Sequence, residues 1–199
     1  MIVQESMDLN KKIFKFYFSN IAKNKDRKDV NVYGYWDEKE ENEIDIVYVN
    51  NMCEEGLISY GTIGTYAHSI GLVVDGKPLR VEFLGMAHQE DEFFPHMLST
   101  CAFNIINSHY RCEPGMVYPD VVKMYYPNVN MKHIYLTSPF IWDGEYTLDI
   151  GPYIVTFLQA IYISDSEYEY IRKNGSDNFE DILEEANVDI LDLNRPSVV

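Results

Sequence analysis

Hydrophobic positions near the N-terminus recur with the spacing of one helix face. Leu9, Ile13, Tyr17 and Ile21 fall four residues apart, and this period is typical of an amphipathic helix that covers a core. The sequence therefore predicts a helix over residues 9–22. Its opposite face and the segment that follows form a basic N-terminal arm, with the cationic residues Lys11, Lys12, Lys15, Lys23, Lys25, Arg27 and Lys28.

Two runs rich in β-branched and aromatic residues follow this arm, over residues 31–36 and 44–49. Such runs predict strands, and the polar segment between them predicts a turn. Residues 37–45 hold six acidic side chains and one lysine. The sequence therefore predicts a β-hairpin with an acidic tip.

The middle of the chain predicts a second antiparallel pair, over residues 57–66 and 79–86, because Asp75-Gly76-Lys77-Pro78 between them favours a turn. A helix is then expected to begin near Pro95, after three acidic residues that suit a helix N-terminus. Two adjacent rows at a spacing of four predict its core face: Phe93, Met97, Cys101 and Ile105, and Phe94, Leu98, Ala102 and Ile106.

The last third of the chain predicts short strands over residues 121–126, 133–137 and 153–163, the last apolar enough for a central strand. Ser164 and Glu167 fit a capping box, which starts a helix that ends at Gly175. A further helix is predicted over residues 177–186. This order of elements predicts an α+β fold with a mixed, mainly antiparallel sheet flanked by helices.

Length and composition bound the class of protein. A chain of 199 residues suits a single domain, residues 1–199, of which residues 1–29 form the N-terminal helix and basic arm. Its formal charge of −16 argues against a binder of nucleic-acid phosphates and favours a basic protein partner. Three irregularly spaced cysteines, the absence of a signal-peptide pattern and the absence of a membrane-length apolar stretch predict a cytoplasmic protein.

One motif resembles a catalytic site. Ala67-His68-Ser69-Ile70-Gly71 fits a variant of the nucleophile elbow of hydrolases, in which a helix must follow the serine. Here Leu72, the β-branched residues Val73 and Val74, and then a turn follow instead. We therefore expect an ordinary strand end, and a hydrolase centred on Ser69 is kept only as the least favoured alternative.

Metal and phosphate motifs are incomplete. His88-Gln89-Glu90 matches one half of a zinc-deaminase signature, and His109 and Cys112 are close in sequence, but a structural zinc site needs four ligands. Gly61 and Gly64 lack the neighbouring cations of a phosphate-binding loop and suit a bent strand. We expect no catalytic residue, metal or cofactor.

Acidic runs are the remaining feature. Besides the hairpin tip, residues 164–195 hold ten acidic residues against three basic ones. Such runs are usually solvated, but they can also speed the encounter with a cationic partner. The candidate partner-binding residues are the two tryptophans and the acidic side chains beside them: Trp36, Asp37, Glu38, Glu40, Glu41, Trp142, Asp143 and Glu145. Either tryptophan could instead belong to the core.

Several short segments resemble one known family. They are Ile58-Ser59-Tyr60-Gly61-Thr62-Ile63-Gly64, Ser138-Pro139-Phe140, Ile163-Ser164-Asp165-Ser166-Glu167-Tyr168, Asn174-Gly175-Ser176 and residues 188–197, which include Asn194-Arg195-Pro196-Ser197. Together they resemble the suppressor of fused domain, from about Val30 to the C-terminus. The order and spacing of the last three segments are the specific part of this similarity.

The resemblance implies a protein-binding domain without catalytic residues. Stand-alone bacterial members of the family are regarded as immunity proteins or antitoxins that neutralise polymorphic toxins, several of them nucleases. The leading hypothesis is therefore a cytoplasmic immunity protein that occludes a cognate, basic toxin. The alternative is a general adaptor that adds a peptide strand to an exposed sheet edge.

Overall fold

The computed structural model describes residues 2–23 and 25–199, so Met1 and Asn24 of the predicted N-terminal segment lie outside the described residues. The chain divides into two compact units. One comprises the residues up to Cys112 together with Ser138–Gln159, and the other comprises Glu113–Thr137 and Ala160–Val199. One strand, β9, begins in the first unit and ends in the second. The single-domain organisation stays a prediction.

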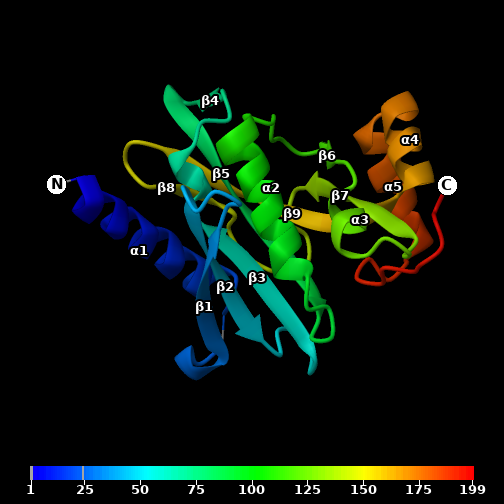
Figure 1. Cartoon of the computed structure of the whole chain (residues 1–199), viewed down its shortest axis with the longest axis horizontal. Coiled ribbons are helices and arrows are strands. Elements are labelled where there is room, and N and C mark those ends of the chain that lie inside the picture. The colour runs from blue at the N-terminus through cyan, green and yellow to red at the C-terminus, as the bar shows by residue number, and fades with distance from the viewer. Residues whose placement is uncertain (1, 24) are drawn as a thin grey trace. The chain divides into compact units, whose positions relative to one another are not determined.

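The first unit is built on a sheet with the strand order β1-β2-β3-β5-β9 (Figure 1). Neighbours are antiparallel except β5 and β9, which run parallel, and two short strands extend the sheet, β4 beside β5 and β8 beside β9. The strands are β1 (Val30–Trp36), β2 (Glu43–Asn50), β3 (Leu57–Ile63), β4 (Val73–Val74), β5 (Lys77–His88), β8 (Thr147–Asp149) and β9 (Ile154–Ser164).

Helices α1 (Ile2–Asn20) and α2 (Phe94–Ser108) pack on opposite faces of this sheet. A Cβ atom on Gly61 of β3 would lie 2.2 Å from the Tyr17 ring of α1, and one on Gly85 of β5 would lie 2.2 Å from the Phe94 ring of α2. Gly85 pairs with Tyr60, the chain neighbour of Gly61, and adjacent residues of a strand point to opposite faces. Each glycine therefore makes room for one aromatic ring, one on each face.

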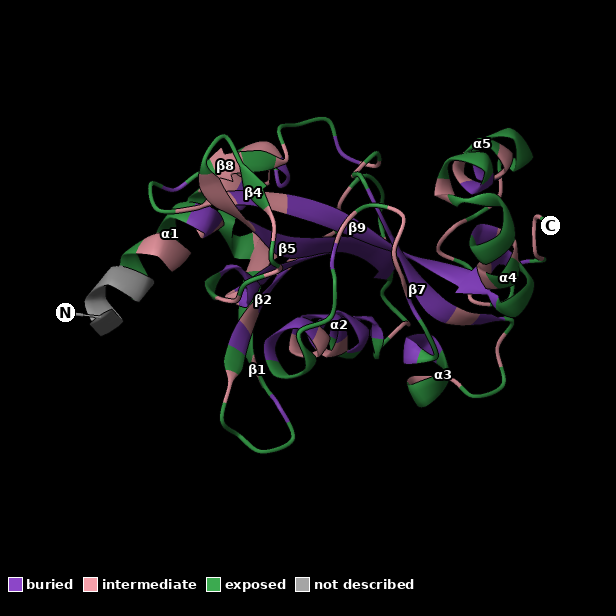
Figure 2. Cartoon of the chain, turned by 90° about the horizontal axis from the view of Figure 1, so that it is seen from above, coloured by how far each residue is buried: buried purple, intermediate pink, exposed green. Residues whose placement is uncertain are grey.

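Burial falls towards the β1 end of the sheet. Strands β5 and β9 are buried over most of their length, whereas five of the seven residues of β1 are exposed (Figure 2). The short 3-10 helix η1 (Arg27–Asp29) leads into β1 from the basic arm. The core of this unit thus lies around the central strands, and β1 forms an exposed edge.

The second unit has the strand order β9-β7-β6 and three helices. Its elements are β6 (Val117–Tyr118), α3 (Val121–Tyr125), β7 (Met131–Thr137), α4 (Asp165–Asn174) and α5 (Ser176–Ala186). Its core consists of buried side chains from β7, β9 and the last two helices: Tyr135, Ile161, Ile163, Ile171, Phe179 and Leu183. The capping box is confirmed, because the Ser164 hydroxyl accepts from the Glu167 amide and the Glu167 carboxylate accepts from the Ser164 amide.

The α+β class and the mixed, mainly antiparallel sheet are confirmed, as are the hairpin, the long α2 helix and the antiparallel pairing of β3 with β5. The strand predicted over residues 121–126 is wrong, because this segment forms helix α3. Its two valines favoured a strand, but the left-handed backbone of Asp120 turns the chain and both valine side chains are buried.

Two smaller expectations are also wrong. Strand β3 ends at Ile63 rather than at Tyr66, because Gly64 takes a φ of +126° and a 3-10 helix, η2 (Thr65–Ala67), follows. Phe93, assigned to the core, is 39% exposed at the start of α2, while the other seven residues of the two rows are buried. None of the described helices is long and apolar enough to cross a membrane.

Candidate partner-binding surface

The tip of the β1–β2 hairpin is organised around the Asp37 carboxylate. Its Oδ1 accepts a hydrogen bond from the Glu41 amide at 2.9 Å, and its Oδ2 accepts from the side-chain amides of Asn42 at 2.9 Å and Asn107 at 3.2 Å. The Asn42 bond and, to a smaller extent, the Glu41 and Asn107 bonds lower the pKa of Asp37 to about 2. Asp37 therefore stays charged and anchors the turn to the end of helix α2.

The three glutamates of the tip face solvent. Glu38, Glu40 and Glu41 are exposed, and Trp36, the last residue of β1, is 54% exposed beside them. Asp37 itself is only 7% exposed. The structure thus separates the predicted tip residues into one buried anchor and four side chains that a partner can contact.

The second predicted group does not join the first. Trp142 is 4% exposed and belongs to the core, whereas Asp143 and Glu145 are exposed. The Asp143 carbonyl accepts a hydrogen bond from the Lys23 ammonium group, just after helix α1. Because the hairpin tip contacts α2 and this loop lies beside α1, the two groups occupy opposite faces of the sheet.

Much of the acidic C-terminal run has a structural role. The Glu167 carboxylate is fully buried and paired with the buried Arg195 guanidinium, with Nη1–Oε1 at 2.6 Å and Nη2–Oε2 at 3.0 Å. Glu180 accepts hydrogen bonds from the Tyr135 and Thr137 hydroxyl groups, both at 2.7 Å. Free acidic side chains remain on the outer face of α5, at Asp181, Glu184 and Glu185.

Sequence patterns alone do not show which acidic residues are buried. Glu167 could be recognised as a capping residue, but its partner Arg195 lies 28 positions away in sequence. Asp37 could have been recognised as a turn residue, because Asp side chains often bond to nearby backbone amides. The exposed face of β1 was missed, since periodicity predicts a strand without showing whether it lies at an edge.

The catalytic and metal motifs do not assemble into sites. A strand, β4, follows Ser69 in place of the helix that a nucleophile elbow needs, and the Ser69 hydroxyl accepts a hydrogen bond from the Gly71 amide at 3.2 Å. Gly61 lies inside β3 against Tyr17. Across the side chains described, those of residues 7–23 and 25–199, no three His, Cys, Asp or Glu residues are grouped so as to hold a metal ion.

The fold defines a domain of the suppressor of fused type. The family described as "Suppressor of fused protein (SUFU)" matches residues 40–196, and the chain belongs to that family. The curated relative "Immunity protein YqcF" of Bacillus subtilis (strain 168) is 41% identical over 166 residues, which cover 83% of this chain and 86% of the relative.

Solved structures agree on the fold. A putative suppressor of fused homologue from Neisseria gonorrhoeae FA 1090 superposes with a TM-score of 0.77 at 17% identity, covering 97% of this chain and 98% of the homologue. Drosophila suppressor of fused gives a TM-score of 0.54 at 12% identity, covering 85% of this chain and 42% of the fly protein. The similarity to the bacterial homologue thus extends over nearly the whole chain.

Proposed function

We propose that this protein is an immunity protein that binds a cognate toxin and neutralises it by covering the toxin's cationic active surface. The observation that carries the proposal is the hairpin tip, where three exposed glutamates stand on a turn fixed by Asp37. A fixed cluster of carboxylates can imitate the phosphates that a nuclease binds, and it accelerates association with a basic protein. The relative named as an immunity protein supports the same role.

The first experiment identifies the partner. The tagged protein is recovered from its native host at about physiological salt, where exposed charges are screened within about 8 Å, and the co-eluting proteins are identified by mass spectrometry. We expect a stoichiometric basic toxin that is released at high salt. Co-expression should also restore growth to cells that produce the toxin, and failure of both would contradict the immunity role.

A second experiment tests the surface. Reversing Glu38, Glu40 and Glu41 to Lys should slow association with the recovered toxin by about tenfold at low ionic strength. The matched control reverses Asp181, Glu184 and Glu185, three exposed residues of α5, which changes the net charge by the same amount. If both variants associate equally fast, the tip is not the contact surface.

A further inference from the structure

Strand β1 lacks the usual protection of a sheet edge. Within the described residues it pairs with β2 alone. Natural edge strands are commonly blocked by proline, charged side chains or bulges, because open strands recruit other strands. Residues 30–36 contain neither proline nor charge, and three apolar side chains are exposed there: Val32 by 44%, Tyr33 by 53% and Trp36 by 54%.

The pairing with β2 shows which backbone groups are open. The Asp37 amide donates to the Asn42 carbonyl at 3.0 Å, so these two residues form a hydrogen-bonded pair. Such pairs alternate along an antiparallel ladder, and the residues between them direct their N–H and C=O groups away from the partner strand. In β1 these residues are Val30, Val32, Gly34 and Trp36, and of their backbone groups the Val30 amide already donates to the Arg27 carbonyl of η1.

The two ends of β1 carry opposite charges. Residues 25–29 before the strand hold three basic and two acidic side chains, a net charge of +1, whereas residues 37–41 after it hold four acidic side chains and one lysine, a net charge of −3. Seven of the 16 basic residues of the chain fall within residues 11–28. A second copy of β1 running antiparallel would place the basic end of each strand beside the acidic end of the other, whereas a parallel copy would oppose like charges.

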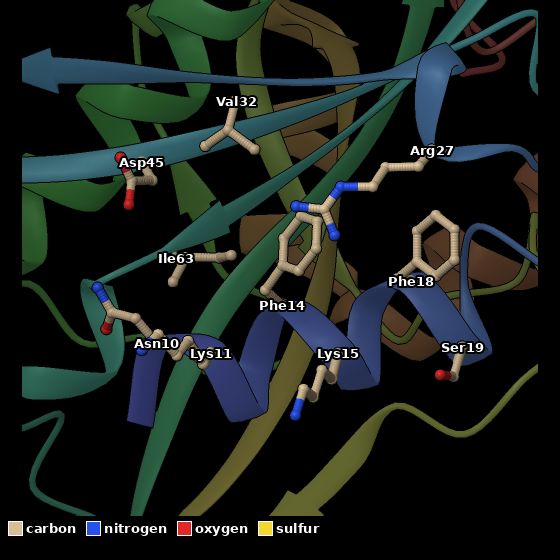
Figure 3. Close-up of a pocket in the computed structure, with 10 residues that line it drawn as sticks. All are labelled: Asn10, Lys11, Phe14, Lys15, Phe18, Ser19, Arg27, Val32, Asp45 and Ile63. Atoms are coloured by element: carbon tan, nitrogen blue, oxygen red, sulfur yellow. The ribbon is translucent and has the colours of Figure 1, made fainter. Parts of the chain in front are cut away.

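A groove opens next to β1, on the face of the sheet that α1 covers. It has a volume of about 420 Å³ and lies between α1 and the sheet, with Phe14, Phe18, Arg27 and Val32 among its lining residues. Phe14 and Phe18 point from α1 towards the sheet, and the Arg27 side chain reaches across from η1 (Figure 3). Trp36 shares the strand face of Val32, because the two residues are an even number of positions apart.

We propose that two copies of the chain associate by antiparallel pairing of their β1 strands. Val32 then lies opposite Gly34 of the second copy and the two Tyr33 residues meet at the two-fold axis, so the N–H and C=O groups of Val32 and Gly34 all gain partners. Trp36 of the second copy lies opposite Val30, where its ring enters the groove beside Phe18 and Arg27. Lys28 in η1 and Glu38 in the turn of the second copy then lie at the same end of the paired strands.

The mass in solution tests this dimer without any toxin, so its outcome is independent of the proposed immunity role. Light scattering at low salt and high micromolar concentration should give twice the chain mass of 23.2 kDa. High salt should shift the protein towards the monomer, because the end charges are then screened. A monomer under all of these conditions overturns the proposal and leaves β1 open to a strand of another protein.

Substitutions distinguish the contribution of backbone hydrogen bonds to the dimer from that of the charged side chains. Val32→Pro removes an outward amide without touching the β1–β2 ladder and should yield a monomer, whereas Val32→Ala keeps the amide and should weaken the dimer less. Lys28→Glu and Glu38→Lys should each raise the dissociation constant by several fold, and the double variant should recover part of the loss. If the double variant is no better than the single ones, the proposed register is wrong.

Tryptophan fluorescence gives the closing measurement. Trp36 is exposed and Trp142 is buried, and these are the two tryptophans of the chain, so acrylamide quenching reports mainly on Trp36. Quenching should fall as the concentration of the wild type rises, and it should stay constant for Val32→Pro, whose fold is checked by circular dichroism. A dimer whose Trp36 remains as accessible as in the monomer contradicts insertion into the groove.

Discussion

Glu82 shows how one buried carboxylate can fix a turn. Its side chain is fully buried on β5 and accepts hydrogen bonds from the Thr62 hydroxyl at 2.6 Å and from the amides of Gly64 at 2.8 Å and Tyr66 at 3.1 Å. Burial raises the pKa of Glu82 to about 7, although these hydrogen bonds oppose the shift. The residue therefore holds the end of β3 to η2 and also makes stability depend on pH.

Stability should fall as the pH rises from about 4.5, the ordinary pKa of a glutamate, to about 7, because the folded state holds a proton that the unfolded state releases in this window. The Glu82→Gln variant should lose this part of the pH dependence. Urea unfolding at a series of pH values measures it, with the exposed Glu90→Gln as control. An unchanged pH profile in Glu82→Gln would show that another group is responsible.

The contact between Gly61 and Tyr17 predicts a second effect at the scale of one residue. Gly61→Ala should lower the free energy of unfolding by about 1–3 kcal/mol, because the new methyl group overlaps the Tyr17 ring. At Gly34 of β1 the added methyl group would meet the flexible Glu43 side chain, so Gly34→Ala should be tolerated. The denaturant midpoints of Gly61→Ala and Gly34→Ala measure the difference. If both variants lose the same free energy of unfolding, the packing argument is wrong.

At the scale of elements, a buried ion pair joins the C-terminal segment to helix α4. Besides pairing with Glu167, Arg195 donates to the Tyr162 carbonyl at 3.0 Å, and the Glu167 carboxylate also accepts from the Val198 amide at 3.1 Å. Glu167 is thus both the capping residue of α4 and the anchor of residues 195–198. Two of the segments that carry the family resemblance, residues 163–168 and 188–197, meet at this ion pair.

Arg195→Met should lower the free energy of unfolding by about 3–5 kcal/mol, because it leaves the Glu167 carboxylate buried without its partner. The matched control is Arg172→Met, which removes an exposed pair with Glu169 on the same helix and should cost under about 1 kcal/mol. Urea unfolding measures both. If Arg195→Met and Arg172→Met lower the free energy of unfolding equally, the buried pair contributes no more to stability than the exposed pair.

At the scale of the whole molecule, charge is the dominant feature. The formal charge is −16, although the arm before β1 is basic, so most exposed charges repel one another. Moderate sodium chloride should therefore raise the melting temperature by screening this repulsion. Differential scanning calorimetry tests this expectation, and a melting temperature that falls with salt would show that attraction between the basic arm and the acidic surfaces dominates.

Local patterns in the sequence predicted most of the elements but little of their placement. The two apolar rows of α2 and the capping box at Ser164 depend on neighbours in sequence, and both are present in the structure. Helix α3 was missed because the left-handed Asp120, rather than the propensity of two valines, decides that turn.

The candidate site was predicted only in part for the same reason. Trp36 and Trp142 both stand beside acidic residues, yet one lies at the sheet edge and the other in the core. No local pattern distinguishes them, because burial depends on strand order. The acidic tip was visible in the sequence, whereas the exposed edge beside it required the sheet topology.

The ion pair at Arg195 has a consequence for synthesis of the protein. A ribosome adds Arg195 28 residues after Glu167, which takes roughly one to six seconds at typical bacterial and eukaryotic rates. Until then the buried Glu167 carboxylate has no counter-charge, so the second unit lacks part of its stability. A chain that lacks Arg195 should therefore open more often around α4 and be cleaved faster by proteases than a chain that contains it.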